Sequence, residues 1–187
     1  MNTGTNGMIL GSNTTANTLS NMIFHLLNNP HTLQRLQSEL RSKFTDIGQI
    51  RLGAALSECE YLSACIEETL RLTPVIGGVT QRVTLADGIE IDGLHIPAGT
   101  DVGVPHHAIM RNPDYFENPW TFEPQRWMAS ETPKEVLRTA KSGYIPFGMG
   151  LTECPGKSWA TIELKLTIAR MLYRYAHSRE YPLLCVC

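Results

Sequence analysis

Apolar residues near the start of the chain recur at a helical spacing. Between about Met8 and Leu27 they stand three and four positions apart, which predicts a helix with one buried stripe. The stripe consists of Leu19, Met22, Ile23 and Leu26. An Asn-Asn-Pro sequence ends this helix, and Pro30 is suited to open the next one with Asn29 as its cap.

Two more helices follow by the same criterion. The first carries Leu33, Leu36, Leu40 and Phe44 on one face. The second runs from about Leu56 to Leu72 and ends before a proline. Its predicted buried face holds Leu62, Cys65, Ile66, Thr69 and Leu70.

The pattern changes after position 78. Residues 79–104 alternate between apolar and polar, and Asp-Gly pairs interrupt them, which predicts short antiparallel strands with tight turns. Residues 105–157 are rich in proline, glycine, asparagine and tryptophan and show no sustained periodicity, which is typical of a long functional loop. A last helix is predicted from Trp159, Ile162, Leu166, Ala169 and Tyr173, and the tail "REYPLLCVC" receives no assignment.

The predicted fold class is therefore mainly α with a small antiparallel β-sheet. The formal net charge of −2 gives no indication of a nucleic-acid partner. No apolar run reaches the roughly 20 residues of a membrane span, and the first residues lack a signal peptide. Five cysteines in a chain of 187 residues favour reduced thiols over a disulfide framework.

The candidate chemistry lies in the sequence "PFGMGLTECPG", residues 146–156. Glycines allow positive φ angles and a close approach to a ligand, and the following helix N-terminus favours a thiolate. The loop therefore suits a shielded thiolate at Cys154, with Phe147 as the shield. No second cysteine or histidine stands at zinc spacing. A lone thiolate points to a cofactor that brings its remaining ligands, as haem does.

Four motifs in this chain resemble those of the cytochrome P-450 monooxygenases. The cysteine loop matches F-x-x-G-x-x-x-C-x-G, and "EETLR" supplies E-x-x-R on a predicted helix. "FEPQRW" resembles the Pro-x-Arg-aromatic segment of the family, and "GSNTT" resembles a segment of its long central helix. The motifs occur in the family's order, so the resemblance implies that residues 1–187 form the C-terminal part of one cytochrome P-450 domain.

The resemblance implies roles for particular residues. Cys154 is the proximal ligand of the haem iron, in a cofactor-binding loop with Phe147, Gly148, Gly150 and Gly156. Glu68 and Arg71 meet Arg126 and brace the core behind the haem. The pattern alone favours a different interpretation, an exposed ion pair one helical turn apart.

Two further assignments come from the resemblance. Thr14 is expected beside bound dioxygen, where it helps to deliver protons, but Asn13 stands where the family has a carboxylate. The alternative is a threonine that bonds to its own helix. Arg82 is expected to pair with a haem propionate, and the alternative is a solvated charge. Thr152 departs from the family, which usually has a basic residue there.

The implied function is a haem-thiolate monooxygenase that oxidises a small organic substrate with dioxygen, in fungal secondary-metabolite biosynthesis. Electrons come from NADPH through a partner reductase. The family resides at the endoplasmic reticulum membrane through an N-terminal anchor, whereas this chain by itself is predicted to be cytoplasmic. Two alternatives stay open. One is a truncated, inactive remnant, and the other is a thiol-based metal-binding or interaction module without haem.

Overall fold

Helices make up most of the described chain, and two small sheets extend from them. The computed structural model describes the backbone of residues 3–175 and the side chains of residues 11–175. The tail that the sequence left unassigned, residues 179–187, therefore lies outside the described residues. The helices are α1 (Thr3–Asn28), α2 (Pro30–Lys43), α3 (Ala54–Ser57), α4 (Glu60–Leu72), α5 (His106–Ile109), α6 (Lys134–Ser142) and α7 (Lys157–Tyr175), with 3-10 turns η1 (Ile47–Gln49), η2 (Pro124–Trp127) and η3 (Gly150–Thr152).

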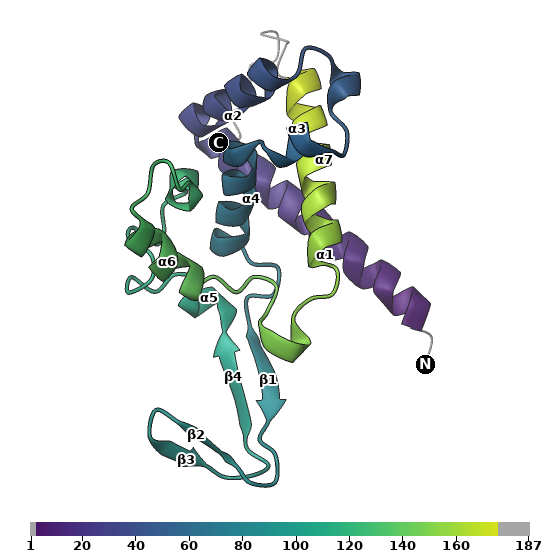
Figure 1. Ribbon diagram of the computed structural model, residues 1–187. Coiled ribbons are helices and arrows are strands. Elements are labelled where there is room, and N and C mark those ends of the chain that lie inside the picture. The colour runs from purple at the N-terminus through teal and green to yellow at the C-terminus, as the bar shows by residue number, and fades with distance from the viewer. Residues whose placement is uncertain (1–2, 176–187) are drawn as a thin grey trace.

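The core lies where α1, α2, α4 and α7 pack together. Figure 1 shows α1 crossing behind α4 and α7, with its N-terminal half projecting away from the other helices. The three predicted helical stripes supply this core, because the apolar positions of α1, α2 and α4 are buried or half-buried there. The fully buried contributors include Met22, Leu36, Leu40, Leu62 and Cys65.

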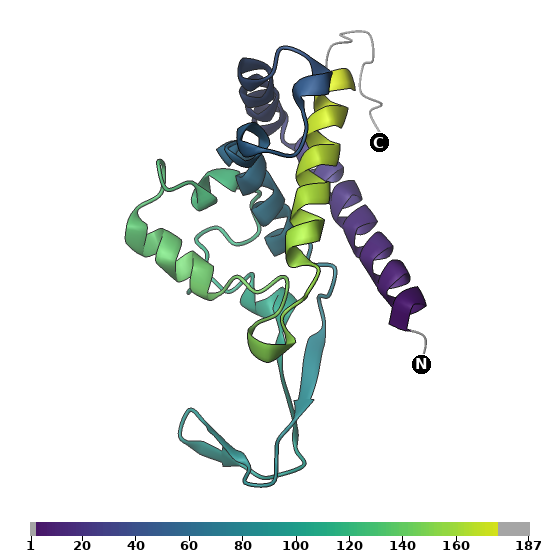
Figure 2. The ribbon, with the colours of Figure 1, turned by 45° about the vertical axis from the view of Figure 1, so that its right-hand side comes forward.

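The strands form two antiparallel ribbons, which confirms the predicted strands. Strand β1 (Val79–Val83) pairs with β4 (Asp101–Pro105), and β2 (Ile89–Ile91) pairs with β3 (Leu94–Ile96). The β2–β3 turn is Asp92-Gly93, and both residues have positive φ, as a two-residue hairpin turn of this kind requires. The ribbons extend away from the helices in Figures 1 and 2. The fold class of helices with a small antiparallel sheet is confirmed.

The single helix predicted over Leu56–Leu72 is wrong in one respect. The structure ends α3 at Ser57 and begins α4 at Glu60. The carboxylate of Glu39 on α2 accepts hydrogen bonds from the backbone N–H groups of Tyr61 (2.8 Å) and Leu62 (2.9 Å). A negative charge at this position satisfies the free donors of a new helix N-terminus, so the helix restarts here.

Asn29 precedes α2 as predicted, but its side chain does not cap that helix. It donates to the His25 carbonyl at 2.8 Å and so completes the end of α1. The expectation of an aperiodic stretch over 105–157 is also wrong in part. Helix α6 buries Leu137 and Ala140 in its middle, and its nine residues are too few for the pattern to stand out.

The predicted last helix is confirmed as α7, and of the residues that predicted it Ala169 is buried while Leu166 and Tyr173 pack against the core. Trp159 is 72% exposed and Ile162 is 38% exposed, whereas Leu164 and Ile168 are buried beside Ala169. Apolar residues lie on more than one side of α7, and its contacts with α1, α2 and α4 decide which of them are buried. The start of α7 therefore presents a tryptophan beside the cysteine loop.

Candidate functional site

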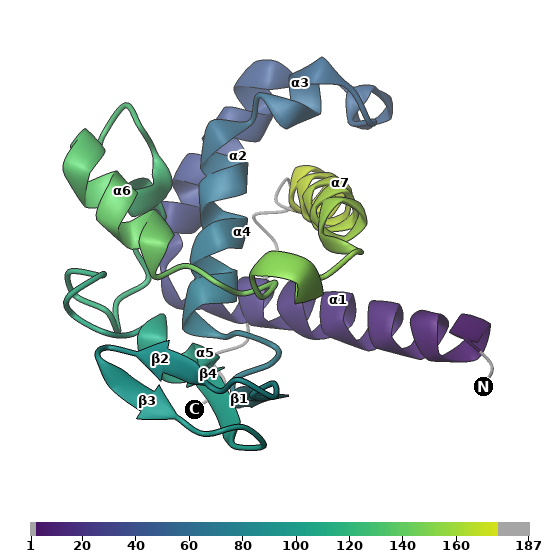
Figure 3. The ribbon, with the colours of Figure 1, turned by 60° about the horizontal axis from the view of Figure 1, so that its bottom comes forward.

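The cysteine loop is a compact turn between α6 and α7. The backbone N–H of Cys154 donates to the Phe147 carbonyl at 2.8 Å, which closes the loop over the positions between them. Gly148 (φ 77°) and Gly150 (φ 74°) both lie in the left-handed region, where a side chain is strained. These two glycines are therefore required by the turn itself. Figure 3 shows this loop beside the N-terminal end of α7 and close to α4.

The thiol of Cys154 is exposed, which contradicts the expectation of a shielded sulfur in this chain. The ring of Phe147 is half-buried against the core, with the ammonium of Lys157 5.9 Å from its centroid. A Cβ added at Gly156 would lie 3.8 Å from the Cys154 sulfur, so that glycine lies directly beside the thiol. The loop thus presents the sulfur outward.

The carboxylate of Glu68 is fully buried on α4 and accepts five hydrogen bonds. Arg71 donates from Nε to one oxygen at 2.9 Å and from Nη2 to the other at 2.8 Å. Arg126 adds a bond from Nε at 3.1 Å, and the backbone N–H of Glu123 adds one at 3.0 Å. The indole N–H of Trp127 completes the set at 2.8 Å. All acceptor positions of the carboxylate are occupied, which offsets the cost of burying its charge.

The side chain of Arg71 is also fully buried, and all of its N–H groups are hydrogen-bonded. Besides its two bonds to Glu68, it donates to the carbonyls of Met110 (2.9 Å), Pro119 (2.7 Å) and Thr121 (3.1 Å). A guanidinium has five N–H groups, so each one has an acceptor. Arg71 therefore joins α4 to the segment between α5 and η2.

The structure brings Glu68, Arg71 and Arg126 together, in the arrangement that the resemblance implied. The alternative of an exposed ion pair does not hold, because both side chains of the α4 pair are 0% exposed. Sequence reasoning missed Trp127 as a fourth member. The aromatic residue of "PQRW" could have indicated it, since the indole of a tryptophan carries an N–H donor.

Thr14 and Asn13 lie on α1. Thr14 is half-buried, and its hydroxyl lies 3.4 Å from the Gly11 carbonyl, as the alternative interpretation expected of a helical threonine. Asn13 is exposed. The buried threonines of this turn are Thr15 and Thr18, each bonded to a carbonyl of its own helix.

The sequence model of the family "cytochrome P-450" matches residues 1–181. The chain belongs to the cytochrome P-450 family. It is 38% identical over 172 residues to the cytochrome P-450 monooxygenase AKT7 of Alternaria alternata, covering 90% of this chain and 33% of that protein. It is 37% identical to the monooxygenase apf7 of Gibberella fujikuroi and 36% identical to poxM of Penicillium oxalicum, each match covering 90% of this chain and 32% of the relative. The chain thus spans about a third of the length of these relatives.

Membership of the cytochrome P-450 family implies haem as the cofactor in general, and the residues around Cys154 can be compared with what a haem requires. A haem supplies four equatorial nitrogens and needs one protein ligand on its proximal side. Among the described residues no group of three or more histidine, cysteine, aspartate or glutamate side chains gathers as a metal site. Cys154 instead offers one exposed sulfur, flanked by the exposed apolar side chains of Met149, Leu151 and Trp159. This donor set fits a large apolar cofactor that carries its own ligands.

Arg82 on β1 is a second cationic group, besides Lys157, next to this cytochrome P-450 loop. Its Nη2 donates to the hydroxyl of Thr152 at 2.6 Å, and its Nη1 donates to the carbonyl of Gln81 at 2.7 Å. The guanidinium therefore lies at the loop and is exposed. A cation from the sheet therefore lies beside Thr152, the position where the family usually has a basic residue.

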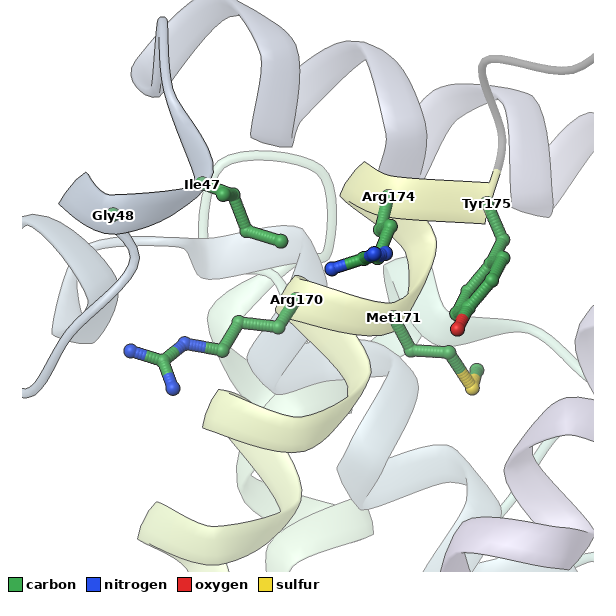
Figure 4. Close-up of a pocket in the computed structure, with 6 residues that line it drawn as sticks. All are labelled: Ile47, Gly48, Arg170, Met171, Arg174 and Tyr175. Carbon is green, nitrogen blue, oxygen red and sulfur yellow. The ribbon is translucent and has the colours of Figure 1, made fainter.

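Two open pockets lie elsewhere. One lies between η1 and the end of α7, about 21 Å along the helix from its start near Cys154 (Figure 4). Its lining consists of Ile47, Gly48, Arg170, Met171, Arg174 and Tyr175. The other is lined by His25 and Phe122, whose rings stack 4.8 Å apart, and by the end of α4. Sequence reasoning missed His25 as a pocket residue.

Among the described residues, no helix is long and apolar enough to cross a membrane.

Proposed function

We propose that this chain carries the proximal haem-thiolate portion of a cytochrome P-450 monooxygenase. The observation that carries the proposal is the loop around Cys154, in which two glycines with positive φ present a single exposed sulfur. Haem bound there would supply the oxygen-activating redox chemistry of the family. Hydroxylation or a related oxidation of a small organic substrate is the reaction class.

The residues of this chain hold and orient the cofactor. Cys154 would give the thiolate ligand, and Phe147, Gly148, Gly150 and Gly156 shape the loop that presents it. Arg82 has N–H groups to spare for a carboxylate of the cofactor, since only two of five are used among the described residues. The Glu68 cluster holds α4 and the η2 segment together behind this loop.

We also assign Thr14 a proton-delivering role, because a hydroxyl both donates and accepts. Asn13 beside it can orient a water molecule but cannot pass on a proton as a carboxylate does. The proposed electron source is NADPH, through a partner reductase, and dioxygen is the second substrate. We propose a fungal secondary metabolite as the substrate class and the endoplasmic reticulum membrane as the location of the whole protein.

A second candidate is a non-catalytic chain of the same family. One observation favours it: an amide at Asn13 stands in place of the acidic side chain of the family. Such a chain would keep the Glu68 cluster and the loop geometry without retaining haem.

A carbon-monoxide difference spectrum of the chain, expressed with haem supplied, separates the two candidates. The monooxygenase proposal predicts a strongly red-shifted Soret band that Cys154→Ala abolishes. Cys59→Ala is the matched control, because it removes a cysteine from a buried position away from the loop. A band that survives Cys154→Ala, or no band in the unmodified chain, would overturn the proposal and support the non-catalytic candidate.

A further inference from the structure

One side-chain hydrogen bond connects the β1–β4 ribbon to the cysteine loop. Arg82, the last residue but one of β1, donates from Nη2 to Oγ1 of Thr152 at 2.6 Å, across 70 positions of sequence. Within residues 11–175, no other hydrogen bond joins residues 146–156 to a segment outside the loop and its flanking residues. The bond is charge-assisted and short, which places it among the stronger kind.

Thr152 is well placed to pass this restraint to the cysteine. It ends the η3 turn two positions before Cys154. The next residue, Glu153, donates its backbone N–H to the Gly150 carbonyl at 3.0 Å, and Cys154 donates to the Phe147 carbonyl at 2.8 Å. The loop is therefore a small hydrogen-bonded unit, and holding Thr152 holds the backbone that carries the sulfur.

The strand side of the bond is also fixed. Arg82 pairs in register with Val102 of β4, and its Nη1 is bonded to the carbonyl of Gln81 at 2.7 Å. Within residues 11–175, three of the five N–H groups of the guanidinium have no acceptor. The hydroxyl of Thr152 keeps its own proton to donate, so the bond does not consume the ligand-binding capacity of either residue.

We propose that Arg82 and Thr152 form a tether that positions the cysteine loop, with Arg82 as a positioning residue for Cys154. A threonine in place of the basic residue usual in this family makes the tether possible, because a hydroxyl oxygen accepts from a guanidinium whereas a second cation repels it. The consequence for thiolate ligation rests on the proposed function. The tether itself does not, since it is a property of the chain without any cofactor.

Amide hydrogen exchange of the peptide that spans residues 147–154 tests the tether directly. The N–H groups of Glu153 and Cys154 exchange only when the loop opens. Losing one hydrogen bond of this kind is expected to raise their exchange rates about two- to tenfold. Thr152→Val and Arg82→Gln should each show this rise, and the double variant should show no further rise. Thr152→Ser, which keeps the hydroxyl, should exchange at the rate of the unmodified chain.

Thr161→Val on α7 is the matched control, because Thr161 bonds only within its own helix in the described structure. It should leave the 147–154 peptide unchanged. The tether is overturned if Thr152→Val and Arg82→Gln leave the exchange rates unchanged, or if their effects add independently.

The carbon-monoxide spectrum provides the second readout on the same variants. If the unmodified chain shows the thiolate-type band, the tether predicts that Thr152→Val loses this band faster with time than Thr161→Val does. Equal loss in the two variants would overturn the positioning role of Arg82. No band in the unmodified chain would overturn the proposed function alone, and the exchange result would still decide the tether.

Discussion

Replacing Glu68 by glutamine is the most severe small change that this structure offers. The side chain keeps its shape but loses its charge, and one acceptor oxygen becomes an N–H₂ group. If Oε2 is replaced, the N–H groups of Arg71 Nε and Trp127 lose their acceptor. If Oε1 is replaced, the N–H groups of Arg71 Nη2, Arg126 Nε and the Glu123 backbone lose theirs. The guanidinium groups of Arg71 and Arg126, which are 0% and 8% exposed, lose their shared counter-charge.

The magnitude follows from what is left behind. Removing one partner of a buried ion pair costs about 3–5 kcal/mol, because the remaining charge stays buried without compensation. A folded domain has about 5–15 kcal/mol of stability in total, so this loss is a large part of it. With a urea m-value of about 2 kcal/mol per molar, the unfolding midpoint should fall by about 2 M.

Urea unfolding followed by far-UV circular dichroism measures this change. Glu135→Gln is the matched control, since Glu135 forms an ion pair with Arg138 at the same i,i+3 spacing on α6, with both side chains about 80% exposed. Its free energy of unfolding should change by less than about 0.5 kcal/mol. A loss below 1 kcal/mol for Glu68→Gln, with the control unchanged, would refute the reasoning that this carboxylate compensates two buried cations.

Three further changes test neighbouring features. Trp127→Phe keeps the ring but removes the indole donor to Glu68, which should cost about 1.5–3 kcal/mol in urea unfolding; a loss under 0.5 kcal/mol would mean that the bond contributes nothing. Burial lowers the pKa of His25 below 6.5, so the unfolded chain binds a proton that the folded chain resists. The free energy of unfolding should therefore be highest above pH 6.5 and fall below it, less steeply in His25→Phe; equal slopes in both proteins would exclude His25 as the cause. Gly148→Ala forces a side chain onto a φ of 77° and should cost about 1 kcal/mol or more in the same assay, and an unchanged midpoint would show that the turn relaxes freely.

The elements whose residues repeat over several turns could be predicted from the sequence. The stripes on α1, α2 and α4 are long, and burial of one face decides their conformation. The Asp92-Gly93 turn could also be predicted, because both residues adopt positive φ in a two-residue hairpin. In these cases the information is local, within one element or one turn.

The parts that could not be predicted depend on contacts between distant residues. The break before α4 depends on Glu39, more than 20 positions away in the sequence. The buried side of α7 depends on which neighbours it meets: of the residues that predicted this helix, Ala169 is buried and Trp159 is exposed. The Glu68 cluster contradicts its own helical pattern, and only the resemblance to a family with the same motifs indicated that it would be buried.

Burying the charges of Glu68, Arg71 and Arg126 costs desolvation free energy, and the hydrogen bonds that these side chains make offset that cost. The segment between α5 and η2 has few regular backbone hydrogen bonds, and Arg71 satisfies three of its carbonyls at once. Glu68 then holds the indole of Trp127, whose ring lies 4.6 Å from that of Tyr144 at an angle of 52°. Tyr144 stands just before the cysteine loop.

The cysteine loop is therefore held from two sides by different chemistry. From inside, the Glu68 cluster fixes Trp127 and, through ring packing, the residue from which the loop departs. From outside, Arg82 holds Thr152 at the end of the same loop. Loss of the inner cluster should destabilise the whole chain, whereas loss of the outer bond should only loosen the loop. The pair of variants Glu68→Gln and Thr152→Val thus separates what folds this chain from what positions Cys154: the first should lower the unfolding midpoint, and the second should raise loop exchange at an unchanged midpoint.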